Sequence, residues 1–407
     1  DLVVEVERQL KKRQRGQAVR LEFEVGTSRF MRRFMTQEMN LEKEDMYQID
    51  GPLDMTVFFG FCGIKGYNHL RYPEAHPHSP WSMLELKRTP ETNIFDMIRE
   101  KDLLIHLPYE SFDESVVNFL YSAANDKDVL AIKQTLYRVS SSSPVVQALE
   151  KAVQNGKQVT VLMEVKARFD EANNILMARR LEKAGAHVIY GLVGLKTHSK
   201  CTLVIRREKD GIRRYVHVAT GNYNASTAKL YTDLGILTCS DRFGIDASAF
   251  FNLLSGYSDP PIWDSFIVAP INLRQRCIEL IDREIHFAKN GEDAHMIAKM
   301  NSLLDKGIIE KLYEASQAGV KIELIVRGIC VLIPGIPGVS DNITVRSIVG
   351  RFLEHSRIFW FRNGGREELY VSSADWMPRN LNDRVELMVP IEDPEIKRRL
   401  KQMVDIE

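Results

Sequence analysis

The sequence VQNGKQVTVLMEVKAR at residues 153–168 is repeated in pattern by SQAGVKIELIVRG at residues 316–328. In each stretch a helical pattern ends at an Asn-Gly or Ala-Gly pair, and a short run of aliphatic residues follows. A Gly that ends a helix, followed by a short apolar run, indicates a helix that leads into a buried strand. Because the same unit occurs twice, the sequence predicts an internal duplication with two similar α/β units.

The segments on both sides of these stretches continue the alternation of strands and helices. In the first unit we expect helices at 144–154 and 171–184 and strands at 129–134, 159–165, 187–192, 200–205 and 216–218. In the second unit we expect a helix at 304–317 and strands at 321–327, 357–361, 368–371 and 384–389. Strands that alternate with helices of about ten residues are typical of α/β domains.

An irregular segment rich in Gly and Pro, at about 61–90, precedes the duplicated part and reads as a long loop or linker. We therefore predict a mixed α+β N-terminal part at 1–90, a first α/β domain at 91–265 and a second at 266–407. The chain begins at Asp1 and stops within a charged helical pattern, which suggests a piece of a longer protein.

Composition narrows the classes of function. The 407 residues are 44% hydrophobic and 27% charged, which is ordinary for a soluble globular protein. The 55 Lys and Arg residues balance the 55 Asp and Glu residues, which argues against a dedicated nucleic-acid coat protein but not against a local basic pocket. The five Cys residues are scattered and never form C-x-x-C, so the sequence predicts neither a disulfide framework nor a zinc site and suits a reducing compartment.

Each unit carries a His with a cation two positions later, His198-Ser-Lys200 and His355-Ser-Arg357. The spacing alone carries little information, because His69-Leu-Arg71 has it as well. The equivalent places of His198 and His355 in the two units are what distinguish them, and a turn of small and amide residues follows each, at 220–224 and 372–375. We therefore expect the two His residues to face one pocket.

The pairing of an imidazole with a cation indicates an anionic ligand. If both residues lie on a strand, positions i and i+2 point to one face and address the same ligand. The cation would hold a phosphate and would lower the pKa of the His, so that the neutral, nucleophilic form predominates. Two strand His residues that bond backbone acceptors are the alternative that the spacing leaves open.

Further cations are placed near the ends of the predicted strands: Lys133, Arg138, Lys166, Arg168, Lys196, Arg327 and Arg384. Ligands of open α/β sheets bind at the carboxyl ends of strands, and Arg suits phosphate oxygens. Together these cations predict a phosphate-lined pocket, although each by itself suits a surface charge. The sequence contains no P-loop and no protein-kinase motif. Tyr231 is a candidate for stacking on a base, with simple packing as the alternative.

At this point the sequence resembles polyphosphate kinases of the bacterial, histidine-phosphorylating type, whose catalytic domains have a phospholipase D-like fold. The resemblance covers about 40–407 and is carried by AIKQTLYR (131–138), NGKQVTVLMEVKARFDEANN (155–174), YGLVGLKTHSK (190–200), ATGNYN (219–224), IAKMNSL (297–303), VRGIC (326–330), SIVGRFLEHSRI (347–358) and DWMPRNL (375–381). It implies two duplicated phospholipase D-like α/β domains preceded by part of a head domain.

The resemblance also implies a reaction, the reversible transfer of the terminal phosphate of ATP to polyphosphate, with ADP as the other product. Matched by motif, His198 resembles the phosphorylated nucleophile and His355 a second catalytic His. The remaining motif positions imply ATP or phosphate contacts at Lys200, Tyr231, Arg327, His355 and Arg384, and a magnesium site at Arg138 and Arg168. A guanidinium offers no lone pair to Mg²⁺, so we expect these two Arg residues to hold phosphate oxygens that in turn hold the metal.

The sequence departs from the wider superfamily pattern H-x-K-x(4)-D. Ile205 and Arg362 stand where the pattern has Asp, and Arg357 replaces the second Lys. The departure makes phosphodiester cleavage, the reaction of the superfamily, a weaker expectation than phosphoryl transfer.

The partners implied by the resemblance are ATP or ADP and inorganic polyphosphate, with no nucleic acid. It further implies a cytoplasmic homo-oligomer and leaves peripheral membrane association open. Two alternatives from other classes stand beside this interpretation. One is a phospholipase D-like phosphodiesterase that acts on nucleic acid or lipid, and the other is a non-catalytic module that binds polyanions through basic pockets.

Overall fold

The computed structural model describes residues 2–13, 16–80, 83–84, 93–167, 170–192, 194–256 and 262–407. The chain forms two compact units, 1–75 and 76–407. The smaller unit is mixed α and β, as predicted: α1 (Leu2–Arg13) and α2 (Arg29–Glu38) accompany a parallel pair of short strands, β1 (Leu21–Glu24) and β2 (Met46–Ile49). Ser28 begins α2, because its side chain accepts a hydrogen bond from the backbone N–H of Met31.

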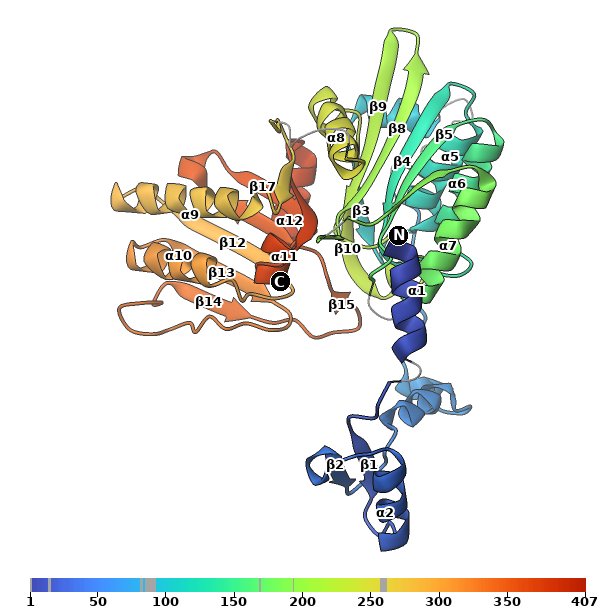
Figure 1. Cartoon of the computed structure of the whole chain (residues 1–407). Coiled ribbons are helices and arrows are strands. Elements are labelled where there is room, and N and C mark those ends of the chain that lie inside the picture. The colour runs from blue at the N-terminus through green and yellow to red at the C-terminus, as the bar shows by residue number, and fades with distance from the viewer. Residues whose placement is uncertain are drawn as a thin grey trace. The chain divides into compact units, whose positions relative to one another are not determined.

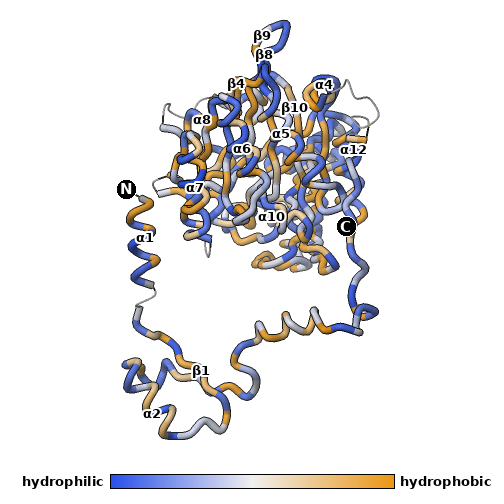
Figure 2. The backbone as a smooth tube through the Cα atoms, turned by 90° about the vertical axis from the view of Figure 1, so that its right-hand side faces the viewer, coloured by the Kyte–Doolittle hydropathy of each residue, from blue (hydrophilic) through white to orange (hydrophobic). Residues whose placement is uncertain are grey.

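The first half of the larger unit is built on one mixed sheet (Figure 1). Its strands run in the order β6 (His187–Tyr190), β5 (Gln158–Met163), β4 (Val129–Leu136), β8 (Lys200–Glu208), β9 (Gly211–Ala219) and β10 (Tyr231–Thr238), and β3 (Leu103–Leu107) pairs with β10. The accompanying helices are α4 (Ile94–Glu100), α5 (Asn118–Asn125), α6 (Pro144–Gln154), α7 (Glu171–Ala184) and α8 (Asp241–Leu254). The charged turn that joins β8 to β9 is the hydrophilic tip that projects from the unit in Figure 2.

The second half repeats this arrangement. Its strands run in the order β14 (Ile343–Arg346), β13 (Lys321–Val326), β12 (His295–Met300), β16 (Ile358–Phe361), β17 (Glu368–Ser372), β18 (Arg384–Pro390) and β11 (Ile267–Ala269). The helices are α9 (Leu273–Lys289), α10 (Lys306–Gln317), α11 (Pro378–Asn382) and α12 (Pro394–Ile406). The same strand order in both sheets confirms the internal duplication that the sequence predicts.

The two halves exchange short strands. β7 (Lys196–Thr197) belongs to the first half by sequence, but it pairs in parallel with β18 of the second half. β15 (Leu353–Glu354) belongs to the second half and pairs in parallel with β10 of the first. His198 follows β7 directly and His355 follows β15 directly, so the exchange places both His residues at the seam between the halves.

A shared apolar core holds the halves together. It joins side chains of the first half, such as Leu203 and Phe250, to side chains of the second, such as Trp360 and Leu400, all of them buried. Burial of this kind stabilises by roughly 25 cal/mol per Å² of apolar surface removed from water. The seam is therefore a rigid platform for the residues that lie in it. Among the described residues, no helix is both long enough and apolar enough to cross a membrane.

Most predicted elements are confirmed, with shifted ends. The helices at 144–154 and 171–184 agree with α6 and α7, and the strand at 200–205 is the first part of β8. His198 and His355 lie just before the strands, in the two- and three-residue connections that precede β8 and β16, so the condition that both residues of each His-cation pair lie on a strand is not met. The cause is the exchange, because the chain must leave the partner sheet before it enters its own.

Candidate active site

His198 is held in place by β18 of the second half, the strand with which β7 pairs. Its backbone N–H and that of Ser199 both donate to the carbonyl of Val385 in β18, at 2.9 and 3.0 Å. Its Nδ1 lies 2.9 Å from Oε2 of Glu386, the next residue of the same strand. The ring of Tyr137, at the end of β4, stands edge-on to the imidazole with the centroids 4.9 Å apart. Backbone and ring of His198 are thus fixed from the second half.

The carboxylate of Glu386 decides which nitrogen of His198 is free. It accepts from Ser373 Oγ at 2.5 Å and from Asn380 Nδ2 at 2.6 Å, and it is fully buried. Burial raises the pKa of Glu386, and the ammonium of Lys200 opposes this rise. We assign the proton of the imidazole to Nδ1, which donates to this acceptor, and the lone pair to Nε2.

His355 repeats this arrangement from the other side. Its Nδ1 lies 2.8 Å from Oδ1 of Asp233 in β10, and its backbone N–H donates to Thr232 Oγ1 at 3.3 Å. Thr220 Oγ1 donates to the same Asp233 oxygen at 2.5 Å, as Ser373 does to Glu386. Each imidazole of one half is therefore oriented by a carboxylate of the other half.

The surroundings keep both imidazoles neutral. Burial lowers the pKa of His198 well below its usual value, and the positive charges of Lys200, Arg384 and Arg357 lower it further. Burial also lowers the pKa of His355, although Asp233 acts in the opposite direction. A neutral imidazole has a lone pair to give, so His198 has the electronic state that a nucleophile needs at neutral pH.

Arg357 and Lys200, the cations beside the two rings, differ in whether a carboxylate is paired with them. Arg357, which is 3% exposed, is paired with Asp375 through contacts of 3.1 and 3.3 Å. Lys200 is 2% exposed and its Nζ donates to the carbonyl of His198. The register equates Asp375 with Asn222, a neutral amide, so the first half lacks the matching carboxylate. Burial lowers the pKa of Lys200 to about 7.

Three more predicted residues gather at the same seam. Tyr231 begins β10, and its ring centroid is 5.2 Å from that of His355. Arg327 follows β13, where burial and the nearby charge of Arg357 lower its pKa. Arg384 begins β18, and its charge is among those that lower the pKa of His198.

The remaining predicted cations lie differently. Arg138 is paired with Asp170 through a contact of 2.7 Å, and Arg168 lies outside the described residues. Lys133 does not join the site: its Nζ is 3.4 Å from Oδ1 of Asn252 on α8, because its position in β4 turns it toward that helix. The expectation that all the strand-end cations converge is therefore wrong for Lys133.

The described residues do not present a ready set of protein ligands for a metal. Within these ranges no group of three or more His, Cys, Asp or Glu side chains is placed to hold an ion. The carboxylates nearest the His pair, Asp233, Asp375 and Glu386, are already bonded to His355, Arg357 and His198. Arg138 offers donors only. The donor chemistry of these residues suits phosphate oxygens and not Mg²⁺ itself.

Sequence reasoning missed the two carboxylates that orient the imidazoles. It looked for Asp at the positions of Ile205 and Arg362, whereas the structure supplies Asp233 and Glu386 from later strands. A signal for them exists in the duplication, because each acid follows a hydroxyl residue of the small turn by 13 positions: Thr220 to Asp233 and Ser373 to Glu386.

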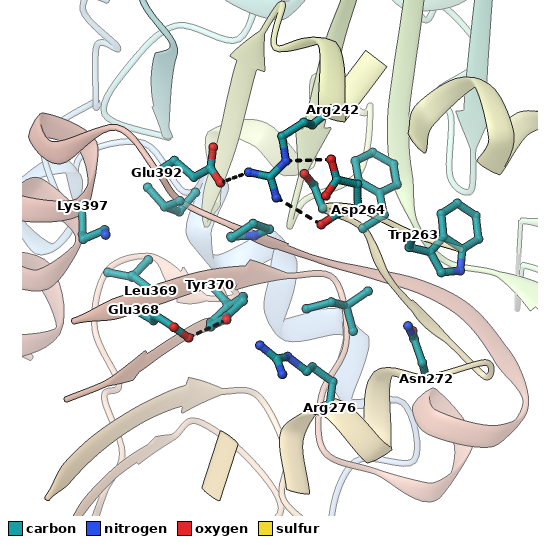
Figure 3. A pocket seen from close by; sticks show the side chains of 15 residues that line it. Arg242, Trp263, Asp264, Asn272, Arg276, Glu368, Leu369, Tyr370, Glu392 and Lys397 are labelled. Atoms are coloured by element: carbon teal, nitrogen blue, oxygen red, sulfur yellow. Dashed lines mark hydrogen bonds and ion pairs between the residues drawn. The ribbon is translucent and has the colours of Figure 1, made fainter. Parts of the chain in front are cut away.

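A larger cavity lies elsewhere in the larger unit, away from the His pair (Figure 3). It has a volume of about 540 Å³ and is lined by residues such as Trp263 and Lys397. Arg242 spans one side, paired with Asp264 at 2.8 Å and with Glu392 at 2.6 Å (Figure 3). The cavity adjoins the start of β17 and the residues after β18, whereas Ser373 and Glu386 lie toward the opposite ends of those strands. Its size alone does not outweigh the chemistry of the His pair.

Comparison with known proteins agrees with this geometry. Family models match the chain in three consecutive parts: the polyphosphate kinase middle domain at 1–61, C-terminal domain 1 at 93–260 and C-terminal domain 2 at 266–407. The polyphosphate kinase of Halalkalibacterium halodurans is 54% identical over 409 aligned residues, which cover all of this chain and 57% of that protein. The chain therefore spans little more than half the length of this relative.

Solved structures show the same relationship. The crystal structure of polyphosphate kinase from Porphyromonas gingivalis superposes with a TM-score of 0.85 at 35% identity, covering 95% of this chain and 58% of that one. Phosphatidylserine synthase of Haemophilus influenzae shares the fold alone, with a TM-score of 0.51 at 10% identity over 75% of this chain and 86% of that one. The duplicated α/β architecture expected from the sequence is thus confirmed. Because three domain models match in order and the similarity runs through the whole chain, the chain belongs to the polyphosphate kinase family.

Proposed function

We propose that this chain carries the catalytic centre of a polyphosphate kinase, which transfers the terminal phosphate of ATP reversibly to polyphosphate through phosphorylated His198. The observation that carries the proposal is a buried, neutral imidazole beside the ammonium of Lys200, with Nδ1 bonded to Glu386 and with no hydrogen bond to Nε2 from the described residues. The names of the related proteins support the same reaction.

The first step forms a bond from Nε2 of His198 to the γ-phosphorus of ATP. The bond between that phosphorus and the bridging oxygen breaks, and its electrons leave on ADP. The imidazole becomes positive as it is phosphorylated. The Glu386 carboxylate, which accepts a hydrogen bond from Nδ1–H, stabilises this charge.

The second step regenerates the imidazole. A terminal oxygen of polyphosphate attacks the phosphorus, the P–N bond breaks, and its electrons return to Nε2. The polymer is then one phosphate longer. With ADP as the acceptor in place of polyphosphate, the same two steps run in the direction of ATP synthesis.

The other residues at the seam neutralise and position the phosphates. Lys200, Arg327 and Arg384 supply positive charge, and phosphoryl transfer depends mainly on such charge and on alignment. Arg357 Nη1 lies 3.3 Å from Nε2 of His355, so the second imidazole and this guanidinium form one polar surface toward the phosphates. The ring of Tyr231 beside His355 offers a face for the base of the nucleotide.

Magnesium enters this proposal only with the phosphates. When bound together with ATP, the metal would neutralise part of the negative charge of the phosphates. Arg138, which is paired with Asp170, is proposed to hold phosphate oxygens that in turn hold the metal. The same role for Arg168 stays a prediction. The homo-oligomer, the cytoplasmic location, the peripheral membrane association and the exclusion of nucleic acid also stay predictions.

The decisive experiment is incubation with Mg²⁺ and ATP labelled in its γ-phosphate, followed by mapping of the labelled residue and sizing of the polymer. We expect an acid-labile label on His198, and loss of both label and polymer in His198→Ala. His69→Ala is the matched control, because His69-Leu-Arg71 has the same spacing and is exposed on the smaller unit.

Label that persists in His198→Ala would sink the assignment of the nucleophile. Release of an alcohol or nucleoside from a phosphodiester, with no label from ATP, would favour the phosphodiesterase instead. Binding of polyphosphate without label or product would favour the non-catalytic module.

A further inference from the structure

A row of polar side chains crosses the interior of the first half. Gln134, Thr202 and His217 are register neighbours on β4, β8 and β9, and all are buried. Thr202 Oγ1 lies 2.8 Å from Gln134 Oε1 and 2.8 Å from the hydroxyl of Tyr223. His217 Nδ1 lies 2.8 Å from the same Tyr223 hydroxyl. The four side chains form one hydrogen-bonded chain.

The second half does without this row. The register equates the four residues with Ala298, Phe359, Tyr370 and Trp376, which belong to an apolar core. There Phe359 and Trp376 stack with their centroids 4.9 Å apart and an interplanar angle of 10°. Burial of polar groups is unfavourable unless every one of them is bonded. Because the second half adopts the same fold with apolar residues at these positions, folding alone does not require the polar row.

The direction of the protons leaves one atom of the row without a partner. A Thr hydroxyl has one proton, and Thr202 gives it to the Gln134 carbonyl oxygen, which can only accept. Tyr223 then donates to Thr202, and Nδ1–H of His217 donates to Tyr223. Nε2 of His217 becomes an acceptor, and among the described residues nothing donates to it. The residue is 2% exposed, and burial lowers its pKa to about 3, so the ring is neutral.

The orphaned nitrogen borders a small internal cavity of about 10 Å³. Asp233 and two glycines, Gly221 and Gly235, line the same cavity. A Cβ at Gly235 would lie 2.5 Å from His217 Nε2, and a Cβ at Gly221 would lie 2.3 Å from Oδ2 of Asp233. Both polar atoms thus use space that the missing side chains leave free. A cavity needs at least about 10–15 Å³ to hold one water molecule, so this cavity is at the lower limit.

The register keeps the two side chains from bonding each other directly. His217 faces Leu237, which is four positions along β10 from Asp233, and no hydrogen bond joins the two side chains in the described part of the chain. Both side chains nevertheless line the same cavity, each against one of the two glycines. A water that donates two hydrogen bonds of about 2.8 Å joins acceptors about 4.5 Å apart. One water in the cavity is therefore a suitable link between the two side chains.

We propose that this cavity binds one water, which donates one hydrogen to Nε2 of His217 and the other to Oδ2 of Asp233. Asp233 Oδ1 already holds Nδ1 of His355. The water therefore ties the polar row of the first half to the carboxylate that orients the second imidazole, and it makes His217 a positioning residue for His355. The consequence for the reaction rests on the proposed function, whereas the water site does not.

The water itself is tested by a crystal structure of this chain at a resolution that shows ordered waters. We expect a single water peak within about 3 Å of both His217 Nε2 and Asp233 Oδ2. A dry cavity, or a water that bonds only one of the two atoms, would overturn the bridge. This test is independent of any activity.

The positioning role is tested by His217→Phe, which removes the acceptor, and by His217→Gln, whose side-chain oxygen replaces Nε2. Loss of an outer partner of a catalytic group lowers activity by about 10–100-fold in other sites. We expect about a tenfold fall in kcat for His217→Phe, an unchanged KM for ATP, and recovery to within about threefold of wild type in His217→Gln. The amount of His198 that can be labelled should stay the same, because its carboxylate comes from β18.

Partial unfolding gives a different result, since it lowers label and turnover together. Should His217→Phe fail to fold, Tyr223→Phe decides, because it removes only the hydroxyl that fixes the His217 tautomer. Tyr370→Phe, at the position equivalent to His217, is the control and should keep the wild-type kcat. Wild-type turnover in His217→Phe would overturn the positioning role, whereas a wild-type chain that takes no label would overturn the proposed function instead.

Discussion

The two halves of the larger unit have one strand order and two different interiors. Both place an imidazole after an exchanged strand and orient it with a carboxylate of the partner half. They differ in the cation beside the ring, which is a Lys with no matching carboxylate in the first half and a neutralised Arg in the second. They differ again beneath it, where a polar row in one half replaces an apolar core in the other.

These differences show what the fold requires and what the chemistry requires. The exchanged strands and the crossed carboxylates occur in both halves, so they belong to the architecture. Arg357 beside His355 has a carboxylate of its own in Asp375, whereas Lys200 beside His198 has no such ion pair among the described residues. The negative charge of Glu386 also acts on Lys200, but that carboxylate is already bonded to His198. The first half therefore offers the less neutralised cation to a phosphate. The comparison supports the proposal that the phosphate carrier is in the first half and that the second half has a supporting role.

The largest expected effect comes from the crossed carboxylates. Glu386→Gln removes the charge that stabilises phosphorylated His198, and Asp233→Asn makes the same change for His355. We expect about 100-fold slower labelling of His198 in Glu386→Gln and about tenfold slower turnover, with near-normal labelling, in Asp233→Asn. Rapid-quench measurements of labelling and steady-state turnover separate the two effects. Equal labelling defects in both variants would break the assignment of different roles.

A smaller effect should follow when the first half receives the carboxylate of the second. Asn222→Asp reproduces Asp375 and places a negative charge where Lys200 would meet phosphate. We expect the KM for ATP to rise about tenfold with a smaller fall in kcat, measured by steady-state kinetics. Asn252→Asp makes the same charge change on α8, away from the His pair, and is the control. An unchanged KM in Asn222→Asp would mean that Lys200 does not bind the phosphates.

The titration of Lys200 predicts a pH dependence. Burial lowers the pKa of its ammonium to about 7, so the positive charge is present below pH 7 and is lost above it. We expect kcat/KM for ATP to fall as the pH rises above about 7, since this constant reports on the free enzyme. Arg keeps its charge in this pH range. In Lys200→Arg the fall of kcat/KM above pH 7 should therefore disappear, even if the highest value of kcat/KM is lower than in the wild type. A fall that persists unchanged in Lys200→Arg would assign it to another group.

The smallest expected effect concerns acid stability. Burial lowers the pKa of His106 to about 4 and that of His217 to about 3, whereas an unfolded His titrates near 6.5. Between these values the unfolded chain binds more protons than the folded one, so stability is lost as the pH falls from about 6.5 toward 4. Both His residues are in the first half. We expect the protection factors for amide hydrogen exchange, which are corrected for the intrinsic effect of pH, to fall more between pH 7 and pH 5 in β9 and β10 than in β17 and β18. An equal fall in the two sheets would contradict this.

The sequence predicts what local patterns encode. α6 begins where Ser143 and Pro144 place a cap and a first turn, and its end at Asn155-Gly156 is as clear, so its bounds follow from the residues alone. The pair His198 and His355 follows from the duplication. Neither example depends on a contact between distant parts of the chain.

What the sequence does not reveal depends on contacts between the halves. β7 and β15 have two residues each, too few for an alternating pattern, and their pairing partners are about 190 and 120 positions away in the sequence. Glu386 and Asp233 orient imidazoles that are 188 and 122 positions away. Their equal spacing from the small turns becomes a signal only once the turns have been matched.

The exchange of β7 and β15 between the halves also suggests how the duplicated chain arose. One half alone would keep its imidazole but lack the carboxylate that orients it, whereas two identical halves related by a twofold axis would complete each other. Such a symmetric pair would hold two equal sites, and fusion of its two genes would place both copies in one polypeptide. After fusion each copy could change without its twin, and Lys200 with Asn222 against Arg357 with Asp375 is the kind of divergence that this freedom allows.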